Sequence, residues 1–290
     1  MSTSNTEYLL ALHSIKGLGP IRLKAVLDYF GDPKLAWEAD GRELARIGLP
    51  KNVVALVLET RRKLDPQKYQ EDVEKAGIGW LTIFDENYPR LLKEIYDPPV
   101  VLYVRGQTLP EDEKAVAVVG TRKITGYGQL VTEKLTRGLS EAGVTVVSGL
   151  ARGVDSEAHR VALEAGGRTL AVLGGGLKKI FPPENLALAH RIADGGGALI
   201  SEFAPDEPSL PGNFPARNRI ISGLSQAVLV TEAAEDSGSL ITAKDALEQG
   251  REVFAVPGPI TSEVSFGPSM LIKQGARLVT DAGEIFEDLG

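Results

Sequence analysis

The chain has 290 residues, a formal net charge of −7 and no cysteine. Disulfides, thiolate metal sites and a cysteine nucleophile are therefore excluded, and His13, His159 and His190 are too scattered to form a metal site. Because the protein is acidic, any site for an anion has to be a local concentration of donors. The longest aliphatic run, 53–58, is too short to cross a bilayer, and the first residues lack a signal-peptide pattern. We therefore expect a cytoplasmic protein without a membrane partner.

The first 75 residues show helical periodicity interrupted by glycine and proline. Leu9 and Leu12 share one face of a first helix, and a second helix runs from Pro20 to the break at 31–33. Further short helices are predicted over 43–47, 53–63 and 67–75. The pattern predicts a small all-helical domain over residues 1–75, of the helix–hairpin–helix or SAM-like kind.

The turn between the first two helices has a pattern found in DNA-binding modules. Residues 15–22 read IKGLGPIR, a glycine–apolar–glycine hairpin whose backbone N–H groups meet phosphate in helix–hairpin–helix proteins. A plain turn between helices has the same letters. Contact between this hairpin and DNA therefore stays open.

From Trp80 onward, short apolar runs alternate with amphipathic segments, the pattern of β-α-β units around a parallel sheet. The runs are almost continuously apolar, as expected of strands that helices cover on both faces. They are 115–119, 144–147, 169–173, 198–200, 227–230 and 252–256, and two further runs, 80–84 and 100–104, are predicted to extend one edge of the sheet. Residues 76–290 are thus predicted to form an α/β, Rossmann-like domain with a doubly wound, mainly parallel sheet.

Glycine, hydroxyl and arginine residues follow these runs. Open parallel sheets bind ligands beyond the carboxyl ends of their strands, where free N–H groups and arginine side chains suit phosphate oxygens. The segments in question are Gly120-Thr121-Arg122-Lys123, Ser148-Gly149 with Arg152-Gly153, and Gly174-Gly175-Gly176. One such turn is ordinary in an α/β protein, but several turns with arginine along one edge predict an anion site.

The standard cofactor fingerprints are missing. Gly126 and Gly128 are followed by Val131 where G-x-G-x-x-G has its third glycine, and the next strand ends in Ser148 where a nicotinamide enzyme usually has a carboxylate. No Walker A sequence occurs either. We therefore expect no cofactor, and a nicotinamide oxidoreductase is disfavoured.

Two later clusters also fit nucleic acid. Phe214, Arg217, Asn218 and Arg219 are suited to stacking a base and holding phosphate. Alternatively, Phe214 fills the core and the arginines pair with Glu202 or Glu232.

The second cluster is Ser237-Gly238-Ser239 with Lys244, a turn that opens a helix. It offers hydroxyls, N–H groups and a cation, although helix capping alone explains either serine.

Catalytic constellations are weak. Asp155 and His159 lie four residues apart at a helix start, where a capping aspartate and a structural histidine are the simpler interpretation. The spacing of Glu202, Glu232 and Asp245 requires no catalytic role.

Taken together, three runs resemble one family. They are VAVVGTRKITGYG at 116–128, SGLARGVDSEAHR from 148 and FPARNRIISGL from 214, and they resemble the bacterial DNA-processing protein A family (DprA, also called Smf) over about residues 75–280. The resemblance implies a Rossmann-like protein that binds single-stranded DNA without known catalysis. It also implies a homodimer that protects incoming strands and loads the RecA recombinase in natural transformation.

The resemblance and the residue patterns together predict the binding residues, with Arg122 as the main phosphate-binding arginine. The predicted nucleic-acid-binding residues are Gly120, Thr121, Arg122, Lys123, Ser148, Gly149, Arg152, Gly153, Gly174, Gly176, Phe214, Arg217, Asn218, Arg219, Ser237, Gly238, Ser239 and Lys244. The resemblance and the apolar content of 270–278 also indicate a dimer face with Met270, Leu271 and Leu278.

The chain departs from the family pattern in two respects. Relatives often have a basic residue near Pro183 or Glu184, so one cation is expected to be missing here. Many relatives also carry a C-terminal winged-helix module, whereas this chain stops at Gly290, either by nature or by truncation. The rival function is an N-glycosidase of the phosphoribohydrolase type, which uses a related fold and a G-G-x-G-T-x-x-E loop. The comparable SGSLITAKD lacks that glycine pattern and has Asp245 in place of the glutamate.

Overall fold

The computed structural model describes residues 5–289, and the chain is helical up to Lys75. The helices are α1 (Thr6–His13), α2 (Pro20–Phe30), α3 (Pro33–Glu38), α4 (Gly41–Arg46), α5 (Lys51–Arg61) and α6 (Pro66–Lys75). Asp32, Asp40 and Asp65 cap α3, α4 and α6 by accepting hydrogen bonds from N–H groups of the first turn. Because of these caps, α4 and α6 begin slightly earlier than the apolar pattern predicted.

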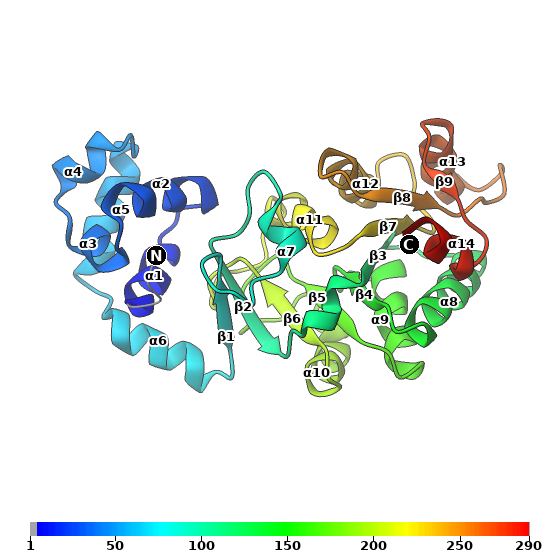
Figure 1. Ribbon diagram of the computed structural model, residues 1–290, viewed down its shortest axis with the longest axis horizontal. Coiled ribbons are helices and arrows are strands. Elements are labelled where there is room, and N and C mark those ends of the chain that lie inside the picture. Colours follow the sequence, from blue (N-terminus) through cyan, green and yellow to red (C-terminus); the bar gives the residue numbers. More distant parts are fainter. Residues whose placement is uncertain (1–4, 290) are drawn as a thin grey trace.

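The rest of the chain is built on one sheet with strand order β1-β2-β6-β5-β4-β3-β7-β8-β9 (Figure 1). The strands are β1 (Gly79–Thr82), β2 (Val101–Gly106), β3 (Ala115–Val119), β4 (Thr145–Ser148), β5 (Thr169–Val172), β6 (Ala198–Ser201), β7 (Ala227–Val230), β8 (Glu252–Ala255) and β9 (Arg277–Leu278). Neighbours from β6 to β9 pair in parallel, whereas β1 and β2 are antiparallel additions beside β6. The mainly parallel sheet and its extended edge are both confirmed.

Helices cover both faces of this sheet, as predicted (Figure 1). On one side lie α8 (Gly126–Glu141), α9 (Val154–Glu164), α10 (Leu186–Asp194) and α14 (Ala282–Leu289), and on the other lie α7 (Arg90–Lys93), α11 (Asn213–Gly223), α12 (Ser239–Glu248) and α13 (Phe266–Lys273). Val116 and Val118 of β3 pack with the first set, and Ala117 and Val119 pack with the second. Burial on both faces explains why the strands read as continuous apolar runs.

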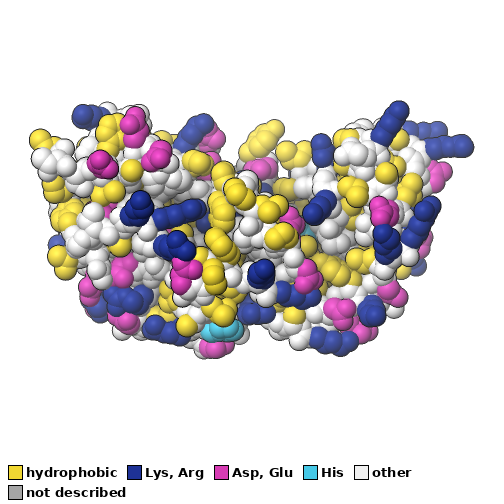
Figure 2. All heavy atoms as spheres, turned by 180° about the vertical axis from the view of Figure 1, so that it is seen from behind, with side chains coloured by type: hydrophobic (Ala, Val, Ile, Leu, Met, Phe, Trp, Pro, Cys, Tyr) yellow, Lys and Arg dark blue, Asp and Glu magenta, His cyan; other side chains and the backbone are white. Residues whose placement is uncertain are grey.

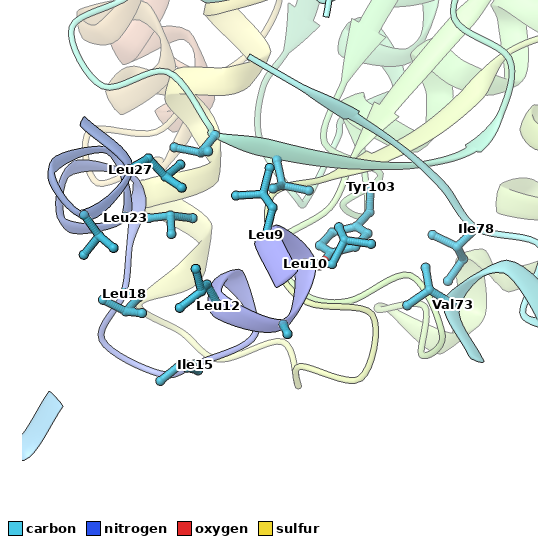
Figure 3. Close-up of a cluster of buried hydrophobic side chains, with 14 of the residues drawn as sticks. Leu9, Leu10, Leu12, Ile15, Leu18, Leu23, Leu27, Val73, Ile78 and Tyr103 are labelled. Atoms are coloured by element: carbon cyan, nitrogen blue, oxygen red, sulfur yellow. The ribbon is translucent and has the colours of Figure 1, made fainter. Parts of the chain in front are cut away.

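A hydrophobic cluster joins the helical part to the sheet. Leu9, Leu10 and Leu12 of α1 lie in the same cluster as Tyr103 of β2, as Figure 3 shows. The cluster also includes Val73 of α6, so it runs across the boundary predicted at residue 75. The division into two domains stays a prediction. None of the helices in residues 5–289 is long and apolar enough to span a bilayer.

Candidate nucleic-acid interface

The loops that follow β3 and β4 are locked together at the carboxyl edge of the sheet. The Thr121 N–H donates to the carbonyl oxygen of Glu232 (2.7 Å), and the Val154 N–H donates to the carbonyl oxygen of Thr121 (3.1 Å). Gly153 has a φ of +74°, and a Cβ there would lie 2.3 Å from the carbonyl oxygen of Thr121. Glycine is therefore required at this crossing for both conformation and space.

Arg122 lies over an aromatic surface at this edge. Its guanidinium carbon is 5.5 Å from the ring centre of Phe214, which in turn lies 6.0 Å from the ring centre of Phe181. A Cβ on Gly174 would come within 2.9 Å of the Phe214 ring, so this glycine makes room for the ring. Arg122 is exposed and, within residues 5–289, makes no ion pair. A cation without an ion pair therefore lies over one of two neighbouring rings.

Phe181 was missed by the sequence analysis. It is 47% exposed and lies in the loop after β5, which has no periodicity that would mark it. The available signal was an aromatic residue placed shortly after the lysines Lys178 and Lys179 at a strand end. Of these lysines, Lys178 pairs with Asp206 (2.8 Å), and Lys179 is exposed.

Arg217 is a buried clamp. It is 4% exposed, and its Nη1 donates to the carbonyl oxygens of Gly149 and Val172, at the ends of β4 and β5. Burial lowers the pKa of Arg217 to about 10, which still leaves it charged at neutral pH. Arg217 was predicted to contact phosphate, but its guanidinium is buried beneath the two loops that it joins by hydrogen bonds.

Asp155 lies next to this clamp and holds the same loop. Its Oδ2 accepts hydrogen bonds from the N–H groups of Gly149 (3.1 Å) and Ala151 (3.3 Å). Burial raises the pKa of Asp155, and the charge of Arg217 opposes this shift. His159 instead bonds through Nδ1 to the Thr169 hydroxyl (2.7 Å), and burial lowers its pKa to about 3. The interpretation of this pair as structural agrees with the geometry.

Arg219 faces away from the two rings. Its guanidinium bonds to Asp97 (2.8 Å) and to both oxygens of Glu202 (2.7 and 2.9 Å). Burial lowers the pKa of Arg219, but these two carboxylates outweigh it and keep the pKa above its usual value. The pairing with Glu202 that was left open is therefore present. A nearby cavity of about 430 Å³ lies between these residues and the hairpin 15–20.

Two further predicted cations are also paired. Arg152 makes an ion pair with Glu184, the position where relatives often have a base, and Lys244 pairs with Glu248 (3.5 Å) along α12. Both pairs are largely exposed, so they contribute little to stability and can open for a ligand. Neither residue has a contact that ties it to Arg122.

The serine turn does lie against the interface. The side-chain amide of Asn218 donates to the carbonyl oxygen of Gly238 (3.1 Å), and the hydroxyls of Ser237 and Ser239 are 2.8 Å apart. Asn218 lies one turn after Phe214 on α11, so the turn is linked to the aromatic surface through that helix. Ser148 is fully buried and donates to the carbonyl oxygen of Val118 (2.7 Å), which makes it a structural link between strands.

Glu232 has a role that the spacing did not reveal. It is 2% exposed, and its carboxylate accepts hydrogen bonds from the N–H (2.9 Å) and the hydroxyl (2.6 Å) of Thr125, the residue that caps α8. It pairs with neither Arg217 nor Arg219. Within residues 5–289, no group of three or more acidic or histidine side chains is placed to hold a metal ion.

The residues proposed for a dimer face are divided. Leu271 is 5% exposed and packs in the core beneath α13, because it lies on the inner side of that helix. Leu278 is 51% exposed on the edge strand β9, and Met270 is half-buried. Leu271 is therefore unavailable to a partner, contrary to the expectation from its apolar character.

Comparison with known proteins identifies the family. Residues 79–290 match the model of DNA recombination-mediator protein A. The chain is 40% identical over its whole length to Protein Smf of Synechocystis, covering 74% of that protein. It also matches the structure of DNA processing protein A from Streptococcus pneumoniae, with a TM-score of 0.84, 38% identity and 97% of each chain covered.

A second solved structure is related as well. It is DNA processing protein A from Helicobacter pylori, described for its single-stranded DNA binding mode, with a TM-score of 0.65 and 31% identity over 73% of this chain and 95% of that one. The resemblance read from the sequence motifs is confirmed. The chain belongs to the DNA recombination-mediator protein A family, the DprA or Smf proteins.

Proposed function

We propose that the chain binds single-stranded DNA along the carboxyl edge of its sheet and catalyses no reaction on it. The observation that carries this proposal is the exposed Arg122 over Phe214, with the half-exposed ring of Phe181 beside it. A cation next to aromatic rings suits a strand whose phosphates bind to donors while its unpaired bases stack. The relationship to the Helicobacter pylori protein supports the same ligand.

Further donors lie in the same loops. Lys123 and Lys179 are exposed, and within residues 5–289 the N–H group of Arg122 donates to no protein acceptor, whereas Gly174 and Gly175 are buried. On the face in Figure 2, basic and acidic side chains are interspersed rather than gathered into one basic surface. Binding is therefore expected to depend on this local set of donors and to show little sequence preference.

Family membership supports the cellular part of the proposal. The chain would act in the cytoplasm as a homodimer that protects incoming strands and loads the RecA recombinase in natural transformation. Its dimer face would include the exposed Leu278 on β9 and the half-buried Met270. Contact between the hairpin 15–20 and DNA stays open.

The N-glycosidase alternative depends on a suitable carboxylate. Burial raises the pKa of Asp245 to about 6, which suits acid–base chemistry near neutral pH. However, the charges that act on Asp245 are those of Glu248, Arg219, Lys244 and Asp97. Asp245 thus lies within the charged surroundings of Arg219 rather than those of Arg122, which favours a binding function.

The first test replaces the exposed arginine. Arg122→Ala should weaken binding to a labelled oligo-dT strand roughly ten- to hundredfold, as expected from the loss of a charge-assisted phosphate contact. Fluorescence anisotropy measures the affinity, and circular dichroism checks that the variant is folded. Arg46→Ala, the same change at an exposed position on α4, should bind like the wild-type protein. Equal affinities for a folded Arg122→Ala and the control would remove Arg122 from the site.

The second test addresses stacking. Phe181→Ala should lower affinity for oligo-dT by about five- to hundredfold, because stacking contributes about 1–3 kcal/mol per base, whereas Phe181→Trp should retain it. Leu247→Ala, which removes another exposed apolar side chain on α12, should have no effect. An unchanged affinity for Phe181→Ala would mean that bases do not use this ring.

The third test separates binding from catalysis. Wild-type protein incubated with each nucleoside monophosphate should release no free base, as measured by chromatography, because Asp245, the counterpart of the glycosidase glutamate, lies among the charges of Arg219 and Asp97. Release that disappears in Asp245→Asn would instead support the N-glycosidase function.

A further inference from the structure

The helix that follows the first parallel strand is where Rossmann-like folds bind the phosphates of nucleotides. Its first N–H groups are unpaired, and its dipole favours an anion at this end. In this chain the corresponding helix is α8, which begins at Gly126 after the cap Thr125. The sequence there keeps two glycines, Gly126 and Gly128, which allow close approach of a ligand.

An internal carboxylate already occupies this helix end. Glu232 reaches it from the end of β7, the strand beside β3, and is 2% exposed. Its Oε2 accepts from the Thr125 N–H (2.9 Å) and its Oε1 accepts from the Thr125 hydroxyl (2.6 Å). The same hydroxyl accepts from the Gly128 N–H (3.0 Å). The carboxylate is thus connected to the first turn of the helix.

The space around the carboxylate is fitted to it. A Cβ on Gly128 would lie 2.0 Å from Oε2 of Glu232, so glycine at this position leaves room for the carboxylate. Within residues 5–289, no Lys, Arg or His makes an ion pair with Glu232. The compensation for its buried charge therefore comes from the hydrogen bonds of Thr125 and the helix dipole, as it would for a bound phosphate.

We propose that Glu232 is a built-in anion that takes the phosphate position of the fold and excludes nucleotide phosphates from α8. A nucleotide or pyrophosphate would have to displace a buried carboxylate or lie against its like charge, and both are unfavourable. Glu232 is in this sense a specificity-determining residue. It prevents phosphate from binding at α8, so that phosphates at this edge of the sheet bind to the loop that carries Arg122. Only this last step rests on the proposed function, since exclusion of phosphate from α8 does not require DNA binding.

The main chain of Glu232 allows the side chain to be tested separately. Its carbonyl oxygen accepts from the Thr121 N–H (2.7 Å), and this bond remains when the side chain changes. The loop that carries Arg122 therefore keeps its main-chain bonds to Glu232 and Val154 in a Glu232 variant. Binding of oligo-dT should change by no more than a few-fold, whereas binding of a small anion at α8 should appear.

The experiment titrates the full chain with inorganic pyrophosphate. Glu232→Ser removes the charge and opens space, Glu232→Gln removes the charge and keeps the shape, and Glu141→Gln is the control that removes an exposed carboxylate at the opposite end of α8. Calorimetry should show pyrophosphate affinity at least about tenfold higher in Glu232→Ser than in the wild-type protein, with Glu232→Gln intermediate. Glu141→Gln should behave like the wild type. In Glu232→Ser the NMR amide signals of Gly126 and Gly128 should shift on titration.

Two results would overturn the proposal. One is a folded Glu232→Ser, or Glu232→Gln if the serine variant does not fold, that gains no pyrophosphate affinity. The other is a shift of the Gly126 and Gly128 amide signals by millimolar pyrophosphate in the wild-type protein, a measurement that needs no variant. If the proposed function is wrong, the wild-type protein will not bind oligo-dT. The comparison of pyrophosphate affinities between the wild type and the Glu232 variants would remain valid in that case.

Discussion

The carboxyl edge of the sheet depends on one buried guanidinium. Arg217 donates from α11 to carbonyl oxygens at the ends of β4 and β5, and Asp155 holds the N–H groups of the same β4 loop. A buried charge is costly unless it is paired and hydrogen-bonded, so the strand ends and the helix are held in one arrangement that satisfies it. Glycine at 149 follows from this constraint, because a Cβ there would lie 2.6 Å from the Arg217 guanidinium.

The arginines at this edge differ in role because they differ in their partners. Arg217 binds carbonyl oxygens, Arg219 binds Asp97 and Glu202, and Arg152 binds Glu184. Arg122 remains exposed over Phe214. An acidic chain can therefore present a cation to an anionic ligand, since the carboxylates of Asp97, Glu202 and Glu184 are paired with the other arginines. Glu232 extends the same principle, because its charge faces the helix dipole of α8 rather than solvent.

The sequence predicted the sheet and the edge at which we propose the site, because alternating apolar runs and glycine-rich strand ends are local signals. It could not rank the arginines, since the pairing with Glu202 was one of several open alternatives and the second partner of Arg219, Asp97, lies 122 residues earlier in a loop without a pattern. Phe181 was missed for a similar reason, because an aromatic residue after two lysines is a weak signal and its packing beside Phe214 depends on the fold. The direction in which Leu271 points was also not predictable, since apolar residues occur on core faces and interfaces alike.

The central claim is that unpaired DNA binds through its phosphates to the donors at this edge. The most direct test measures the affinity of the wild-type protein for a labelled single strand and for a duplex of equal length over a series of salt concentrations. The account predicts tighter binding of the single strand throughout, with a slope of log affinity against log salt of about −3 to −4 if about four to six phosphates are neutralised. A flat salt response, or a duplex bound as tightly as the single strand, would contradict it.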